Sequence, residues 1–137
     1  MLQPTRPRHR ARMAQIISII ASYGYVSMVR QVAGERVFAP LRKRQPDEAL
    51  ILRGLEAAHR VLDALEAIIP RDGPVAGGEV WSLADFHLAP MMVYFTTAPE
   101  GAEALVGYRK LSAWWHVMRD RNSVKAVATG LPAERPA

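Results

Sequence analysis

The stretch that most constrains the fold begins at Gly78, where a helix-start signal precedes a long apolar run. Ser82 is followed three residues later by Asp85, which is the spacing of a capping box, in which each side chain accepts a hydrogen bond from the other residue's backbone N–H. Trp81 and Phe86 flank the box at the positions of a hydrophobic staple. The pattern predicts a helix that begins at Ser82 and holds Asp85 as a buried structural acid.

Pro90 lies eight residues into this predicted helix. A proline inside a helix removes one backbone donor and clashes with the preceding turn. Since the apolar residues continue from Met91 to Phe95, we expect a kink at Pro90 and not a stop. The segment Thr96 to Pro99 is expected to end the helix.

Helical periodicity and terminating residues predict the other elements. A first long helix is expected from about Arg8 to about Val32, with Gly34 as its stop. The sequence Pro46-Asp47-Glu48 suits a helix start, and apolar residues then recur at three- and four-residue steps as far as Pro70. Shorter helices are expected over residues 100–106, 109–119 and 123–128. The fold class is therefore all-α, a bundle of five or six helices.

The chain is long enough for one domain, and its composition is that of a globular protein. It has 137 residues, of which 50% are hydrophobic and 23% charged. The absence of cysteine excludes disulfides and thiolate chemistry, and it permits a reducing compartment. Neither a cleavable leader nor about 18 uninterrupted apolar residues can be found, so we expect a soluble protein with no membrane segment.

Positive charge is concentrated at the start of the first predicted helix. The net charge is +5, and no acidic residue precedes Glu35. Cations at a helix N-terminus oppose the helix dipole by ~0.3–1 kcal/mol each. We therefore expect an acidic surface, on another domain or a partner subunit, to compensate. Nucleic acid is the less favoured partner, because no aromatic residues are interleaved for base stacking. The basic side chains are Arg6, Arg8, Arg10 and Arg12, joined by His9.

The first predicted helix has two notable faces. Isoleucines at positions 16, 17, 19 and 20 surround it almost completely, which indicates cover on every side and makes it a candidate for both the core and an intersubunit or interdomain contact. A row of small residues follows another side at helical spacing: Ala14, Ser18, Ala21 and Ser22, with Tyr25 at its end. Such a row leaves a groove that a second helix can approach closely.

Residues suited to catalysis do not assemble into a recognisable motif. The four histidines, His9, His59, His87 and His116, have no partner at the i,i+4 spacing of a metal pair, so no metal site is expected. A serine-hydrolase Gly-x-Ser-x-Gly is absent. Gly77-Gly78 lacks the lysine and spacing of a phosphate loop and is interpreted as a flexible turn. We expect no catalytic residue in the chain.

Several motifs together resemble the glutathione S-transferase C-terminal domain, of the bacterial type. The capping box with Gly78 ahead of it and Leu-Ala-Pro after it is similar to the family's central helix. Leu2-Gln-Pro resembles the end of its interdomain linker, and Arg10-Ala-Arg-Met opens a long helix as in the family. The stretch from Tyr108 through Trp114-Trp115 to Arg121-Asn-Ser-Val resembles the family's closing segment, with Asn122 where the family has proline.

The resemblance implies a domain plan. Residues 1–7 would be a remnant of the interdomain linker, residues 8–128 the helical domain, and residues 129–137 a loose tail. The family's thioredoxin-like N-terminal half, which binds glutathione and activates its thiol, has no counterpart here. The chain would therefore bind no cofactor alone, and whether it acts as an enzyme stays open.

The resemblance also implies a function. The helical domain would supply the pocket for a small hydrophobic electrophile, with Ser18, Ser22 and Tyr25 facing it, and a dimer or interdomain surface. Glutathione would be the co-substrate once a thioredoxin-like domain or a homodimer partner is present, and a cytoplasmic detoxification role is expected. A non-catalytic interaction module of the same fold is the alternative, which the basic N-terminus fits equally well.

Overall fold

The computed structural model describes residues 2–132, and throughout this range the chain forms helices and loops without strands, which confirms the all-α prediction. Three consecutive segments make one continuous helix, so the described residues contain six helices. The elements are α1 (Pro7–Ile19), η1 (Ile20–Phe38), α2 (Ala39–Leu41), α3 (Glu48–Ile68), α4 (Leu83–Thr97), α5 (Pro99–Val106), α6 (Arg109–Met118) and α7 (Asn122–Ala128).

The first helix is longer than the sequence predicted. It continues past Gly34, the expected stop, and ends at Leu41. Glycine costs only about 1 kcal/mol in a helix interior. Here Val37 and Ala39, both buried, follow the glycine and hold the extra turns against the core. Tertiary packing therefore outweighs the local stop signal.

The middle of this long helix, η1, is a π-helix of 19 residues. Its backbone bonds span five residues, as where the Ala39 N–H donates to the Gly34 carbonyl. The buried residues of this segment are Ile20, Gly24, Ser27, Met28, Val32, Ala33, Glu35 and Val37.

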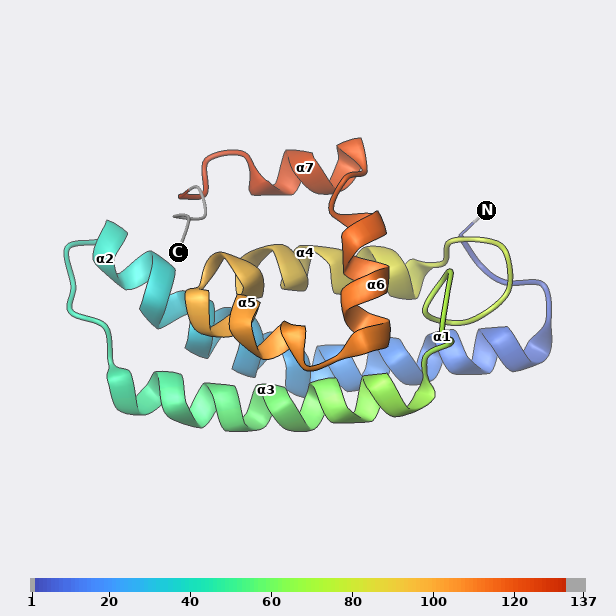
Figure 1. The fold of residues 1–137 in the computed structure, drawn as a ribbon, viewed down its shortest axis with the longest axis horizontal. Coiled ribbons are helices and arrows are strands. Elements are labelled where there is room, and N and C mark those ends of the chain that lie inside the picture. The colour runs from blue at the N-terminus through green and yellow to red at the C-terminus, as the bar shows by residue number, and fades with distance from the viewer. Residues whose placement is uncertain (1, 133–137) are drawn as a thin grey trace.

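The helix α3 runs beside η1, as Figure 1 shows in green beneath the blue and cyan helix. Asp47 caps α3 by accepting a hydrogen bond from the Leu50 N–H at 3.0 Å. The two helices come close together at Gly54, where an added Cβ would lie 2.8 Å from the Gln31 Cβ. The predicted apolar stripe is buried at Ile51, Ala58, Leu62, Leu65 and Ile69.

The helix α4 occupies the centre, in contact with α1, η1, α5, α6 and α7 (Figure 1). It begins after Ser82, as predicted, and continues through Pro90 to Thr97. The next turn fits only because residue 101 is glycine: a Cβ there would lie 1.9 Å from the Phe95 carbonyl oxygen. The helix α4 is thus the element on which the long helix, α5, α6 and α7 pack, whereas α3 packs mainly on η1.

Two ion-pair groups fasten the C-terminal end of the long helix to its neighbours. Arg36 donates from Nε to Glu100 on α5 at 2.6 Å and from both terminal nitrogens to Glu48 on α3. Glu35, which is buried, accepts two 2.9 Å hydrogen bonds from Arg44. The Arg44 hydrogen bonds, helped by one from the Asp47 N–H, lower the pKa of Glu35. These pairs close the loop between the long helix and α3.

The long helix, Pro7–Leu41, is the single helix among residues 2–132 with the length and apolar content needed to cross a membrane. The most apolar 18-residue window has a mean hydropathy of 1.3 and is 39% buried. Core helices of soluble proteins meet the same criterion, so this property assigns no membrane role.

Candidate functional site

The start of α4 holds a buried polar centre built on Asp85, whose side chain is fully buried. Its Oδ2 accepts from the Ser82 N–H at 2.7 Å and from the Ser82 hydroxyl at 3.1 Å. Its Oδ1 accepts from the Val75 N–H and from Trp114 Nε1, both at 2.9 Å. The carboxylate therefore joins the α3–α4 loop, the start of α4 and the middle of α6.

Trp81 and Phe86, the predicted staple, are both partly buried against the core. Arg121, which precedes α7, places its guanidinium carbon 5.4 Å from the Trp81 ring centroid and 5.6 Å from that of Phe86. A guanidinium within about 6 Å of an aromatic ring is attracted to it. The guanidinium of Arg121 thus lies over the two aromatic rings of the staple. Gly78, ahead of the box, has a positive φ of 83° and lies against His9.

The predicted small-residue row on the first helix lies at the surface. Ala14, Ser18, Ala21 and Ser22 are all exposed, and Tyr25 retains 47% of its accessible surface. Among residues 2–132, no second helix covers this row. The row is therefore available to a ligand, another domain or another chain.

A groove of about 660 Å³ adjoins this row and lies between the long helix and α3. Tyr23, with 69% of its surface exposed, and Val26, with 45%, stand on its η1 side. Ser22 is the one predicted site residue that lines the groove, while Ser18 and Tyr25 lie outside it. Tyr23 and Val26 were not among the predicted site residues, because they line the groove only where the long helix packs beside α3. The α3 side is formed by Ala57, Arg60, Val61 and Ala64.

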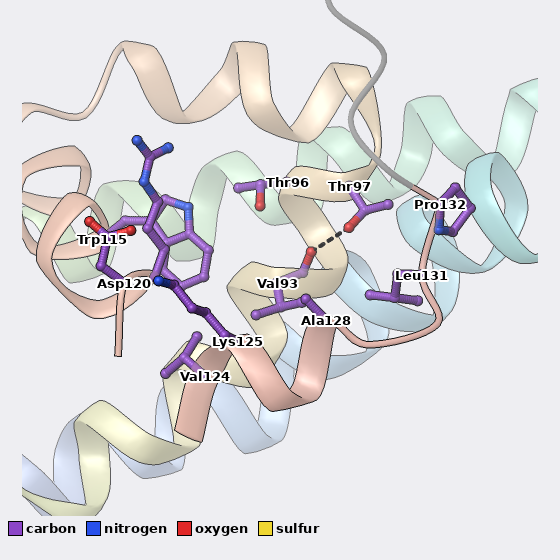
Figure 2. A pocket seen from close by; sticks show the side chains of 11 residues that line it. Val93, Thr96, Thr97, Trp115, Asp120, Val124, Lys125, Ala128, Leu131 and Pro132 are labelled. Atoms are coloured by element: carbon purple, nitrogen blue, oxygen red, sulfur yellow. Dashed lines mark hydrogen bonds between the residues drawn. The ribbon is translucent and has the colours of Figure 1, made fainter. Parts of the chain in front are cut away.

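A separate pocket of about 360 Å³ lies where α4, α6 and α7 meet (Figure 2). Val93, Thr96 and Thr97 of α4 form one wall, and Val124 and Ala128 of α7 face them, as Figure 2 shows. Trp115, which is 8% exposed, closes the side toward α6. Nothing in the sequence pattern indicated this pocket, because it depends on where the short α7 returns over α4.

A polar cluster links α3 to the start of α6. The Tyr108 hydroxyl donates to Asp63 Oδ1 at 2.8 Å and lies 2.9 Å from His59 Nδ1. Burial, reinforced by the hydrogen bond to Asp63, raises the pKa of Tyr108 to about 12. The phenol therefore keeps its proton at neutral pH and serves as a hydrogen-bond donor, not as a nucleophile.

The remaining charged residues do not assemble a reactive site. No group of three histidine or acidic side chains among residues 2–132 could hold a metal ion. The first turn of α1 contains no acidic residue, and Arg10 bonds instead to the carbonyl oxygens of Pro4 and Thr5. The basic N-terminal face thus has no acidic partner in its own first turn.

Comparison with known proteins identifies the fold and the family. The model of the glutathione S-transferase C-terminal domain family matches residues 33–114, which is more than half of the chain. The chain belongs to this family. It is the helical domain of a glutathione S-transferase-like protein.

Curated relatives agree with this assignment. Glutathione S-transferase F10 of Arabidopsis thaliana is 38% identical over 93 residues, which are 67% of this chain and 42% of the relative. Glutathione S-transferase 1 of Zea mays is 26% identical over 119 residues, or 86% of this chain and 54% of the relative. The chain spans about half the length of the curated relatives it matches. The expected bacterial type is not confirmed, because these relatives are plant proteins.

Solved structures show the same fold. Glutathione S-transferase III in its apo form superimposes with a TM-score of 0.82 at 24% identity, over 99% of this chain and 61% of that one. Glutathione transferase F7 of Populus trichocarpa gives a TM-score of 0.79 at 25% identity, over 95% of this chain and 60% of that one. The helical domain therefore resembles, along nearly its entire length, the helical part of larger transferases.

Proposed function

We propose that this chain acts as the electrophile-binding and association domain of a glutathione S-transferase, and that it is not catalytically self-sufficient. Ser18, Ser22 and Tyr25 would face the electrophile on the exposed row of the first helix. The neighbouring groove, with Tyr23 and Val26, would meet a second subunit. Residues 1–7 would be the end of the linker from a thioredoxin-like domain, and the working protein would be cytoplasmic.

One observation carries the proposal: the small-residue row and the groove beside it stay uncovered on a helix whose opposite face is core. Apolar and aromatic side chains gathered at one exposed place are typical of ligand or protein contact sites. A solved relative is described as bound to lactoylglutathione, a glutathione derivative. The likeness of this chain to the helical part of such a protein supports a role beside glutathione rather than in holding it.

If the glutathione site lies on a separate thioredoxin-like domain, the isolated chain should bind glutathione no more tightly than the millimolar range. Isothermal titration calorimetry of the 137-residue chain with glutathione tests this directly. Micromolar binding would overturn the assignment of the glutathione site to a separate domain.

Association is tested by sedimentation of the chain at two concentrations. Replacing Tyr23→Ser and Val26→Ser together is expected to shift the equilibrium toward monomer, since about 25 cal/mol per Å² of apolar contact is lost. Leu52→Ser is the matched control, because Leu52 is 64% exposed on α3 and does not line the groove. Unchanged association in the double variant, or an equal loss in the control, would reject the groove as the subunit contact.

A further inference from the structure

The start of the first helix carries arginines whose charges are not neutralised by neighbouring acids. Arg6, Arg8 and Arg12 form no ion pair within residues 2–132. Arg6 and Arg8 are exposed, and Arg12 is half-buried one helical turn beyond Arg8. Arg10 is engaged differently, because it donates to backbone carbonyl oxygens of the segment before α1. Three cations at this end of the chain therefore remain available to an external anion.

A hollow of about 570 Å³ separates the start of α1 from the turn that precedes α4. Arg6 and His9 line it on one side, and Gly77 and Gly78 on the other. The His9 ring lies against both glycines, since a Cβ added at Gly77 or Gly78 would lie 3.2 or 3.0 Å from a ring atom. Both glycines also have positive φ, of 86° and 83°, which other residues rarely adopt. The hollow is therefore a fixed feature of the fold.

Exposed aliphatic side chains border this hollow. Val80 lines it and keeps 55% of its surface exposed. Leu2 and Leu83 retain 43% and 40%, and a 2.8 Å hydrogen bond from the Leu83 N–H to the Leu2 carbonyl oxygen holds them together. Scattered exposed aliphatic side chains are ordinary, but here they stand beside unpaired arginines. Together with the three arginines and the hollow, these side chains make up what we call the N-terminal face.

The position of the N-terminal face favours a flat partner. Figure 1 shows the start of α1, the residues before it and the loop between α3 and α4 gathered at one end of the molecule. A planar surface can therefore touch all three segments at once. Among the described residues, Pro4 and Val80 are the apolar members of the hollow's lining, which offers no apolar seat for an anchoring side chain of a protein partner. Tryptophan, tyrosine and phenylalanine do not line it, which disfavours stacking on nucleic-acid bases.

We propose that the N-terminal face binds peripherally to the surface of an anionic phospholipid bilayer. The three arginines contact lipid phosphates, a headgroup enters the hollow beside Arg6, and the aliphatic side chains reach toward the acyl chains. Surfaces that combine cations with apolar groups bind at the bilayer interface in this way, and each cation contributes about fivefold to the binding constant. The contact goes beyond the proposed function, because the hollow shares no residue with the first-helix row or the η1–α3 groove.

The test is co-sedimentation of the 137-residue chain with vesicles of phosphatidylcholine, with and without phosphatidylglycerol. Binding is expected only to the vesicles with phosphatidylglycerol, and it should weaken as the salt concentration rises. Replacing Arg6, Arg8 and Arg12 together by glutamine is expected to weaken it about 100-fold. The matched control carries the same replacement at three exposed arginines elsewhere, which removes the same charge and should weaken binding by less than about threefold. These control positions are Arg42, Arg53 and Arg109.

Two single variants test the other parts of the face. Val80→Ser is expected to weaken vesicle binding by about two- to threefold, because less apolar surface enters the interface. Val106→Ser is its control, since Val106 is 77% exposed on α5, and should leave binding unchanged. Glu79→Gln should strengthen binding by about fivefold, because Glu79 is the acidic side chain in the hollow's lining.

Several outcomes would overturn the proposal. Equal binding to vesicles with and without phosphatidylglycerol would show that lipid charge is not recognised. Equal losses in the two triple variants would indicate nonspecific attraction by a basic protein, provided that circular dichroism shows both to be folded. Tighter binding to polyglutamate or to duplex DNA than to the anionic vesicles would assign the N-terminal face to an acidic protein or a nucleic acid and reject the bilayer.

Discussion

At the scale of single residues, Asp85 has the most consequences for stability. One buried carboxylate accepts four hydrogen bonds from three segments, namely Val75, Ser82 and Trp114. A buried donor left without an acceptor costs about 1–3 kcal/mol. The capping box therefore does more than begin α4, because the same oxygens also position the preceding loop and α6.

Removing this acceptor should be severe. Asp85→Ala leaves four buried donor groups without this acceptor and is expected to lower the free energy of unfolding by about 3–5 kcal/mol. Asp85→Asn keeps one acceptor oxygen but turns an amide N–H₂ toward one pair of donors, so its expected cost is smaller, about 2 kcal/mol. Urea denaturation followed by circular dichroism measures both.

Trp114→Phe is the comparison, because it removes one donor and leaves the carboxylate with its other partners. The expected cost of the lost hydrogen bond is about 1 kcal/mol, apart from the change in ring size. If Asp85→Ala proved no worse than Trp114→Phe, the convergence of bonds on Asp85 would not be the source of its effect.

The sequence could indicate Asp85 and Ser82, because a capping box is encoded by residues three apart. It could not indicate that Val75 and Trp114 bond to the same carboxylate. Those contacts join positions 10 and 29 residues away and arise only when the loop and α6 fold back onto α4. The polar cluster of Tyr108 with His59 and Asp63 could not be predicted either, because these residues are also distant in the sequence and meet only in the fold.

At the scale of elements, the contact between η1 and α3 depends on the absence of a side chain at Gly54. An added Cβ would lie 2.8 Å from the Gln31 Cβ, 3.0 Å from the Val32 Cγ2 and 3.2 Å from the Ser27 carbonyl oxygen. Distances below 3.0 Å force one of the helices to move. The lack of a side chain at Gly54 of α3 therefore makes room for the residues of η1 that pack against it.

Gly54→Ala is expected to destabilise the protein. Alanine gains about 1 kcal/mol of intrinsic helix preference over glycine, but overpacking of a tight contact costs about 1–3 kcal/mol. We expect the clash to prevail, with a net loss of roughly 1 kcal/mol and a lower melting temperature. Thermal unfolding followed by circular dichroism measures the change.

Gly24→Ala provides the matched control on η1. A Cβ at Gly24 would meet its nearest neighbour, the Ile20 Cβ, at 3.4 Å, which is an ordinary contact. This variant should be neutral or slightly stabilising. A Gly54 variant at least as stable as the Gly24 variant would show that the two helices can separate freely.

The same element shows why local signals misjudged the first helix. Gly34 was interpreted as the helix stop from its residue type alone. The structure continues the helix to Leu41, with buried Val37 and Ala39 beyond the glycine, and changes the repeat after Ile19. Neither the packing of distant residues nor a π-helical repeat can be inferred from one stretch of sequence.

At the scale of the whole molecule, side chains from distant elements tie the layers together. Arg36 connects η1 with α3 and α5, and Tyr108 connects the start of α6 with α3. Glu66 on α3 accepts from the Lys110 and Leu111 N–H groups at the start of α6, at 2.8 and 3.0 Å. The bundle is therefore held by cross-links at its surface as well as by its apolar core.

Tyr108→Phe tests one of these ties through its dependence on pH. The pKa of Tyr108 is raised in the folded protein to about 12, so its contribution to stability is fully present below its unfolded pKa near 10 and is lost as the pH rises through about 12. The variant should be less stable than the parent at neutral pH, by about 1 kcal/mol. The difference should shrink above pH ~10.

Urea denaturation at neutral and alkaline pH measures this difference. Tyr25→Phe is the control, because Tyr25 is exposed and its hydroxyl makes no hydrogen bond within the described residues. The control should match the parent at both pH values. A difference between Tyr108→Phe and the parent that stayed constant up to strongly alkaline pH would contradict the raised pKa.

The π-helical segment also sets the angular position of everything that follows it. An α-helix turns by about 100° per residue, and the wider coil turns by less. Over 19 residues this lag accumulates, and it brings Glu35 to Arg44 and Arg36 to Glu48 and Glu100. Deleting or inserting one residue between Ile20 and Phe38 would rotate Glu35 and Arg36 about the helix axis, away from their partners. Length changes in this segment should therefore be tolerated far less well than substitutions on its exposed side.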